Sequence, residues 1–220
     1  MTRMSGSNHE DPGILRRLGL KRVLGAGAGA LARVVILPLL ISCNIRRTLV
    51  GDGAFVASSQ LLSLVPGLFG DCLRREFHRS ALAHCGAGVQ IVFGSFFSSR
   101  SATVGDNVYI GSHCVIGDAD IESDVLLGSN VHLLSGRAQH GIADPLRPIR
   151  LQPRRFDRIR IGEDTWIGNQ SIIMANVGRK CVIGAGSVVV SEVPDHSIAA
   201  GNPAKILRSR EAERDQQTGS

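Results

Sequence analysis

His140 is the side chain of this sequence best placed to act as a general base. It lies in the segment Leu134–Gly141, LSGRAQHG, where a regular repeat stops and irregular sequence begins. An imidazole exchanges its proton near neutral pH, and a positioned His accelerates the deprotonation of a hydroxyl by about 10²- to 10⁴-fold. Because a loop that leaves a rigid wall can carry a reactive side chain to a cleft, we interpret His140 as a candidate catalytic base.

Other chemistries have less support in the residue pattern. The sequence contains no Gly-x-Ser-x-Gly elbow, so a covalent acyl-enzyme is not expected. Its five Cys form no Cys-x-x-Cys pair, which argues against a zinc knuckle or a disulfide framework and suits a reducing cytoplasm. The histidines also lack the close His-x-His pairs that a zinc site would favour. We therefore predict no resident metal.

A six-residue repeat surrounds the candidate base. An aliphatic residue, usually followed by Gly, comes four positions before a small residue; Val104 with Val108, Ile110 with Cys114, and Ile167 with Ser171 are examples. Alternation along a short strand turns the small residue and the aliphatic residue two places later to the same side, and Gly permits the turn that follows. Three such units close one triangular coil, so the period predicts a parallel β-helix. At the small inward position, Cys114 and Cys181 are predicted to pack as apolar residues.

The repeat divides the chain into four parts. Residues 1–13 are predicted to be a loose polar tail, and 14–86 a partly apolar helical region in which 71–85 forms a helix with Leu73, Phe77 and Ala81 on one face. The β-helix is expected over 87–194, with an excursion at 135–160, and a tail with a short helix over 195–220. From Ile167 to Ile183 there are 16 residues where three hexads would take 18, so a corner at 174–176 is shortened.

Positive charge is concentrated in the excursion. The chain has a formal net charge of +6, and six Arg fall between 147 and 160, namely Arg147, Arg150, Arg154, Arg155, Arg158 and Arg160. No aromatic residues are interleaved as stacking platforms, so nucleic acid is not expected. Phosphate groups on a small ligand or lipid head groups are the favoured partners, and a solvated basic surface is the alternative.

The apolar stretch 23–43 leaves three interpretations open. Its length approaches that of a membrane span, but Arg33 and Pro38 interrupt it. The residues Leu40-Ile41-Ser42-Cys43 resemble a lipoprotein cleavage site. An interfacial or core-packing helix accounts best for the basic flanks. The interfacial form would contact the inner face of the cytoplasmic membrane, and the core-packing form would not.

The C-terminal half of the sequence resembles the hexapeptide-repeat acyltransferases. The motifs that carry the resemblance are Ile161–Gly168 (IGEDTWIG), Val182–Val189 (VIGAGSVV) and Gly201–Lys205 (GNPAK). They are similar to those of the maltose and galactoside O-acetyltransferases, and more closely to those of acetyltransferases of exopolysaccharide and capsule synthesis. The resemblance covers 87–210 and implies a left-handed parallel β-helix, a homotrimer with active sites between subunits, and transfer of an acyl group, usually acetyl, from coenzyme A to a sugar hydroxyl.

The resemblance also implies roles for individual residues. It places the catalytic His at His140 and substrate contacts at His113, His132 and Arg137. His113 stands where relatives tend to carry Asn, so acceptor binding, proton relay and solvation all stay open for it; His132 faces either a neighbouring subunit or water. The residues implied for the cofactor, acetyl-CoA or another acyl-CoA, are Trp166, Gly168, Asn169, Gly184, Ala185, Lys205 and Arg208, with the two basic side chains meeting its phosphates. Packing is the favoured role of Trp166.

Two other functions fit the same scaffold. The gamma-type carbonic anhydrases use a similar β-helix with three His across a subunit boundary, so a metal hydratase is one alternative. A non-catalytic β-helix that serves as a scaffold or binding module is the other. Metal analysis and binding to coenzyme A separate these alternatives from an O-acetyltransferase of polysaccharide or glycolipid biosynthesis.

Overall fold

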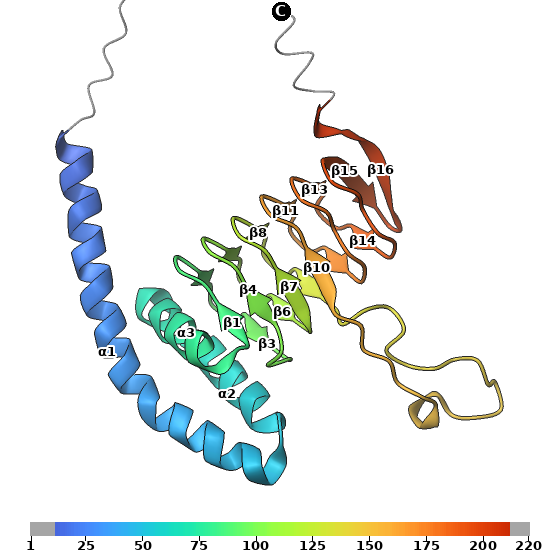
Figure 1. Cartoon of the computed structure of the whole chain (residues 1–220), viewed down its shortest axis with the longest axis horizontal. Helices are drawn as coiled ribbons and strands as arrows, with labels where there is room; N and C mark the ends of the chain where they lie inside the picture. The colour runs from blue at the N-terminus through green and yellow to red at the C-terminus, as the bar shows by residue number, and fades with distance from the viewer. Residues whose placement is uncertain (1–11, 212–220) are drawn as a thin grey trace, which may run out of the picture.

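The hexapeptide units form the coils of a parallel β-helix in the computed structural model of the chain (Figure 1). The structure describes residues 12–211, with side chains given for 29–49 and 51–211. The strands of the first coils are β1 (His84–Cys85), β2 (Gln90–Ile91), β3 (Phe96–Phe97), β4 (Thr103–Val104), β5 (Tyr109–Ile110), β6 (Val115–Ile116), β7 (Ala119–Ile121), β8 (Leu126–Leu127) and β9 (His132–Leu133). Those of the later coils are β10 (Ile159–Ile161), β11 (Trp166–Ile167), β12 (Ile172–Ile173), β13 (Val182–Ile183), β14 (Val188–Val189), β15 (Ser197–Gly201) and β16 (Ala204–Ser209).

Successive coils stack into the three faces of a prism. One sheet has the strand order β1-β4-β7-β10, a second β16-β15-β13-β11-β8-β5-β2, and a third β14-β12-β9-β6-β3. We call them sheets A, B and C. All pairs are parallel except β15 with β16. The mainly β, parallel β-helix class predicted from the repeat is confirmed, and the left-handed sense implied by the resemblance is consistent with it.

The side chains predicted to point inward form the core of the prism. Val104, Ile110, Ile116, Leu127 and Ile167 are all fully buried. Cys114 and Cys181 are buried as well, and burial raises the pKa of both thiols. They are therefore apolar packing residues, as the repeat predicts.

The strand register confirms the shortened coil. Ile110 pairs with Leu127, a repeat of 17 residues, whereas Ile167 pairs with Ile183 and Ile173 with Val189, a repeat of 16. At the corresponding corner, Val177 contributes isolated bridges to Ile161 and Val193 instead of a strand. The coil is therefore shortened at the corner between sheets C and A.

Three helices precede the prism in the described part of the chain: α1 (Pro12–Val50), α2 (Gly53–Ser63) and α3 (Gly67–Ala81). The predicted helix over 71–85 corresponds to α3, with Leu73, Phe77 and Ala81 on its buried face. It starts and ends earlier than predicted because His84 and Cys85 pair with β4 as the first strand of sheet A. Residues 1–11 of the predicted tail lie outside the described residues.

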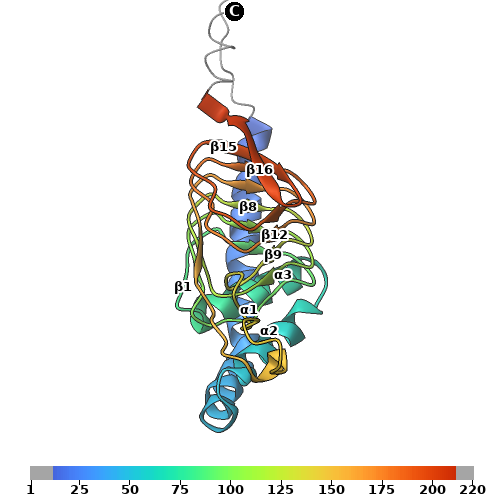
Figure 2. The same cartoon turned by 90° about the vertical axis from the view of Figure 1, so that its right-hand side faces the viewer.

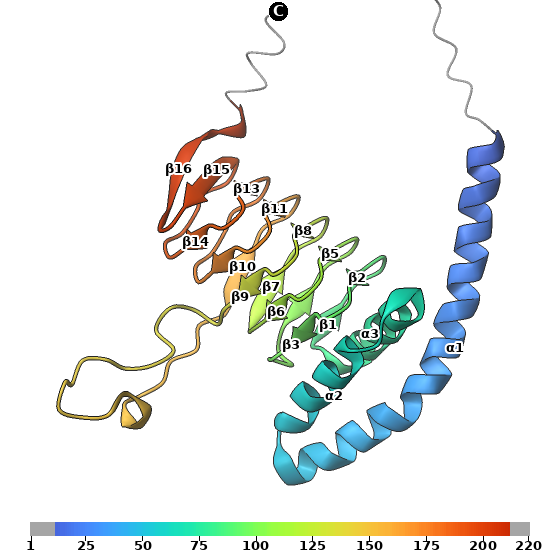
Figure 3. The same ribbon diagram turned by 180° about the vertical axis from the view of Figure 1, so that it is seen from behind.

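Helices α2 and α3 cover the open end of the prism, and α1 lies outside them (Figure 3). Phe55 and Phe77 stack at 6.1 Å between ring centroids, and the His78 ring lies 4.8 Å from that of Phe97 in β3. Buried polar side chains pair with the backbone of the first coil, because an uncapped sheet end would leave its core and its N–H and C=O groups exposed. Arg74 donates from Nε to the Ile91 carbonyl at 2.8 Å.

The last strand departs from the sequence prediction. Residues 204–209 were expected to lead into a helical tail, but they form β16, antiparallel to β15 at the edge of sheet B. Helical conformation starts at Arg210, and the rest of the predicted short helix lies outside the described residues.

Candidate active site

The residues assigned to the cofactor gather on sheet B and on the corner between sheets B and C. Trp166 in β11 lies beside Val182, Val182 beside Ile198, and Ile198 beside Arg208 in β16. Residues in register project from the same side of a sheet. Trp166 is 54% exposed, and it shares the outer face of sheet B with Arg208, about 14 Å away at three strand spacings. Lys205, opposite Ala200, projects from the same face.

The corner residues have packing roles of their own. A Cβ on Gly168 would lie 2.5 Å from the backbone nitrogen of Ala185, and one on Gly184 would lie 2.8 Å from the Cβ of Ala200. Neither position tolerates a side chain, because the next coil lies directly against it. The Asn169 side chain accepts a hydrogen bond from the backbone of Ser129 at 2.8 Å, so it ties two coils together. A slot for a ligand along this corner is the additional role that the resemblance implies.

His140 lies on the excursion that leaves the corner between sheets C and A. This loop runs from β9 to β10 and contains a short 3-10 helix at Ile149–Leu151. It extends away from the helices in Figure 1 and toward the viewer in Figure 2. Gly141 donates its N–H to the Pro153 carbonyl at 2.8 Å, which joins the two strands of the loop beside His140. The buried Gln152 donates to the carbonyls of Asp144 and Arg147. The imidazole is therefore exposed on a loop with internal order.

A hollow of about 410 Å³ lies at the root of this loop. Arg137 lines it and donates from Nη1 to the Val190 carbonyl at 3.4 Å. The sequence interpretation missed three polar residues here, Asp157, Asn176 and Glu192, which come from the loop and from two later coils. The shortened coil was the available signal, since its corner at 174–176 forms one wall. That corner lies beside the hollow and not beside Asn169 and Ala185.

The two other candidate substrate residues take different positions. His132 projects from the outer face of sheet C, half-buried between Val115 and Ile172 in the neighbouring strands. His113 occupies a turn on the corner between sheets B and C, with φ of 59° and its ring 5.5 Å from that of Phe93. It therefore shares a corner with Asn169, although it lies two coils away.

In one copy of the chain, the candidate base and the residues assigned to the cofactor do not lie together. The excursion with His140 and Arg137 leaves one edge of sheet C, and the corner with Asn169 and Ala185 forms the opposite edge. The outer face of sheet C, with His132, lies between them. The candidate base and the residues assigned to the cofactor therefore lie on different edges of the prism in one copy of the chain.

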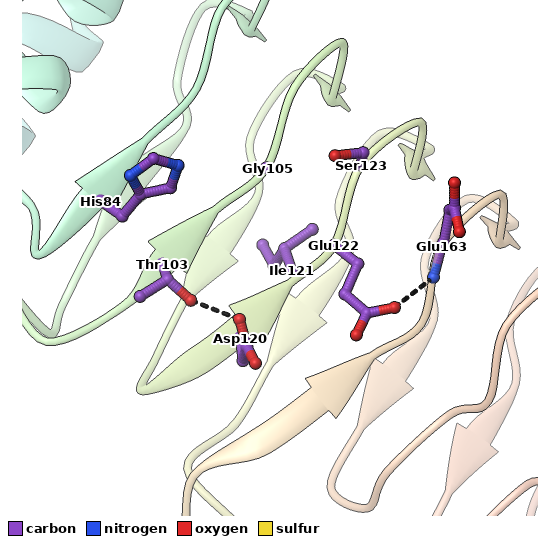
Figure 4. Close-up of a pocket in the computed structure, with 8 residues that line it drawn as sticks. All are labelled: His84, Thr103, Gly105, Asp120, Ile121, Glu122, Ser123 and Glu163. Atoms are coloured by element: carbon purple, nitrogen blue, oxygen red, sulfur yellow. Dashed lines mark hydrogen bonds between the residues drawn. The ribbon is translucent and has the colours of Figure 1, made fainter.

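A second hollow, of about 570 Å³, lies on sheet A (Figure 4). Its polar side chains are largely paired with one another or with the backbone. Thr103 donates to Asp120, and Glu122 accepts from the guanidinium of Arg160 and, at 2.9 Å, from the backbone N–H of Glu163. No group of three or more His, Cys, Asp or Glu side chains that could hold a metal ion occurs within the described residues.

Comparison with known proteins agrees with this architecture. The hexapeptide repeat of succinyl-transferase matches residues 101–135 and 158–191. A probable acetyltransferase of Mycobacterium tuberculosis is 35% identical over 116 residues, which make up 50% of this chain and 38% of that protein. A putative acetyltransferase of Saccharomyces cerevisiae is 34% identical over 109 residues, or 48% of this chain and 54% of that protein. The chain thus spans about half, or less, of the curated relatives that it matches.

Solved structures show the same fold. A hexapeptide-repeat containing acetyltransferase from Vibrio cholerae superposes with a TM-score of 0.59 at 26% identity, covering 71% of this chain and 91% of that one. A maltose O-acetyltransferase from Clostridium difficile gives a TM-score of 0.61 at 21% identity, covering 74% and 88%. The chain therefore shares the hexapeptide repeat and the parallel β-helix fold with these proteins. The predicted resemblance to the hexapeptide-repeat acetyltransferases is confirmed.

Proposed function

We propose that the protein is an O-acetyltransferase that moves an acyl group, normally acetyl, from coenzyme A to a sugar hydroxyl. The observation that carries the proposal is the presence of two features on one prism, at opposite edges of sheet C. One is a loop that presents His140, and the other is a corner and sheet face that present Trp166, Lys205 and Arg208. The acetyltransferase relatives and the Vibrio cholerae structure support the same activity.

The chain supplies a base and a place for a charged donor. His140 takes the proton of the acceptor hydroxyl as that oxygen attacks the thioester carbonyl, so the new C–O bond forms while the C–S bond breaks. The proton is then available to the departing thiolate. Lys205 and Arg208 offer positive charge to the phosphates of the donor. Direct transfer in a ternary complex follows from the absence of a Gly-x-Ser-x-Gly elbow in the sequence.

A homotrimer would complete the site. Sheets B and C both carry apolar outward residues, whereas sheet A is polar, with His84, Thr103, Asp120 and Arg160 facing out. The outward residues of sheet B are Gln90, Tyr109, Leu126, Trp166 and Val182, and those of sheet C are Phe96, Val115, His132, Ile172 and Val188. Two different apolar faces suit a head-to-tail ring, in which the loop of one copy reaches the corner of the next.

The loop-root hollow is our candidate for the acceptor. Arg137, Asp157, Asn176 and Glu192 offer the mixture of donors and acceptors that sugar hydroxyls require. The basic excursion suits an anionic or lipid-linked saccharide, and on this basis we place the enzyme in polysaccharide or glycolipid biosynthesis.

The test is acetyl transfer by the purified full chain, measured as release of free thiol from acetyl-CoA across a panel of sugar acceptors. Substitution of His140 by Ala should lower kcat by about 10²- to 10⁴-fold with the oligomer intact. His84→Ala, which removes an exposed imidazole from sheet A, is the matched control and should keep the wild-type rate. Equal turnover by wild type and His140→Ala would refute the role of His140, and failure to bind coenzyme A would favour a scaffold.

A further inference from the structure

The outer face of α1 is apolar over its described length. Large aliphatic side chains recur there at helical spacing, and each is about half exposed or more: Leu31, Val34, Val35, Leu37, Ile41, Ile45 and Leu49. A shallow hollow of about 450 Å³ on this face is lined by Leu37, Pro38, Ile41, Ser42, Ile45 and Arg46. Exposed apolar surface of this extent marks a site of interaction.

The opposite face of α1 is already covered. Ala32, Ile36 and Cys43 are buried against the other helices. Arg33 donates to the buried carboxylate of Glu76 in α3 at 2.7 Å, and this ion pair fixes the rotation of the helix. A helix that is apolar all round is normally buried all round. In α1, the inner face packs against the other helices, whereas the outer face is exposed among the described residues.

The charge of α1 indicates what covers the outer half. The sequence of the helix, 39 residues long, contains Lys and Arg but no Asp or Glu. Arg46 and Arg47 follow the exposed aliphatic residues near its C-terminal end, and both are exposed. Apolar side chains with basic flanks fit the interface of an anionic bilayer, where burial of the apolar side chains and attraction of the basic ones to anionic lipids both favour binding. We propose that the outer face of α1 lies in the surface of an anionic lipid bilayer, with the helix parallel to the membrane.

Two other occupants fit less well. The window Gly29–Leu49 is long and apolar enough to cross a membrane by length and composition. A span would place Arg33 in hydrocarbon and remove the closest partner of Glu76, which is 4% exposed. A second copy packed face to face on α1 would offer Arg46 and Arg47 no acidic residue of α1 as a partner.

The position of α1 also suits a flat partner. The helices cover one end of the prism, and α1 is the outermost of them (Figures 1 and 3). Copies assembled side by side, as we propose for the enzyme, would therefore present α1 at the same end. Several weak contacts with one surface act together, so binding would exceed that of one helix.

Co-sedimentation of the full chain with lipid vesicles tests the proposal. The wild type should pellet with vesicles of phosphatidylcholine and phosphatidylglycerol, more weakly with phosphatidylcholine alone, and more weakly at high salt. The double variant Val34→Glu with Ile41→Glu should lower partition by about tenfold or more, because it replaces exposed apolar contacts. Arg46→Gln with Arg47→Gln should lower it by about tenfold on the anionic vesicles alone.

Leu146→Glu is the control for an added glutamate on a highly exposed aliphatic position outside α1. It should pellet like the wild type, and circular dichroism should show equal helix content in all variants. The proposal is overturned if the variant Val34→Glu with Ile41→Glu pellets like the wild type, or if the wild-type protein does not pellet with anionic vesicles. It is also overturned if an alkaline wash fails to release the bound protein, which indicates a span, or if the double variant instead abolishes self-association. Vesicle binding does not depend on acetyl transfer, so the result stands apart from the proposed activity.

Discussion

Lowering the pH should destabilise the folded protein at His78, where the helices pack against the prism. This side chain is fully buried, and its Nδ1 is 2.7 Å from the Arg74 carbonyl, so Nδ1 carries the proton. Nε2 then accepts from the Ser59 hydroxyl at 2.9 Å, and Ser59 Oγ accepts the backbone N–H of Phe97 in β3 at 3.0 Å. A second proton on the imidazole would make Nε2 a donor, so the Ser59 hydroxyl proton would lose its acceptor and a positive charge would be buried. Burial accordingly lowers the pKa of His78 to about 4.

The sign and size of the effect follow from that pKa. The unfolded chain protonates His78 below its usual pKa of 6.5, whereas the folded chain keeps it neutral down to about 4. The unfolded state therefore binds more protons in this window, and stability falls as the pH falls. From pH 7 to pH 5 the loss is about 2 kcal/mol, and by pH 4 it approaches about 3 kcal/mol. That is a large fraction of the total stability of a domain, about 5–15 kcal/mol.

The assay is denaturant unfolding at pH 7, 6 and 5 with the protomer concentration held constant, because association also stabilises the folded state. His78→Gln keeps a donor and an acceptor but cannot titrate, so it should be less stable at pH 7 and should lose about 2 kcal/mol less than the wild type on going to pH 5. His84→Gln, at an exposed His, should follow the wild type. Equal losses by the wild type and His78→Gln would refute the reasoning.

Two further predictions concern the prism. Gly168→Ala should destabilise the protein by about 1–3 kcal/mol, because the new Cβ meets the backbone of Ala185. Gly53→Ala, where nothing lies within 4 Å, is its control, and equal denaturation midpoints for the two variants would contradict the close coil packing. Cys114 and Cys181 should resist thiol reagents at mildly alkaline pH in the native state, because burial raises their pKa. Cys72, which is partly exposed, should react before them, and labelling of Cys114 ahead of Cys72, read by mass spectrometry, would argue for an open prism.

The core of the prism could be predicted because its cause is local. Each hexad sets its own turn and its own alternation, so Ile110, Cys114 and Ile167 point inward whatever the distant sequence does. The shortened coil was equally visible, as a count of residues. The first coil was less visible, since β1 and β4 are 19 residues apart in register and Val92 and Ser98 stand where a hexad usually has Gly.

Tertiary contacts decided the rest. The sequence pattern of α3 does not show that Arg74 and His78 are buried. Arg74 donates to the Ile91 carbonyl of the first coil, and His78 contacts Ser59 of α2, which accepts the backbone N–H of Phe97. The same holds for Asp157, Asn176 and Glu192 at the loop root, which the closure of successive coils brings together.

The sequence by itself determined the repeat, the inward faces and the loop that bears His140, because these depend on spacing along the chain. Only the tertiary structure decided that His140 and the corner at Asn169 lie on opposite edges of sheet C, and that one face of α1 is left without a protein partner. Those outcomes depend on how the coils stack and on which faces the stack covers, and a one-dimensional pattern does not record either.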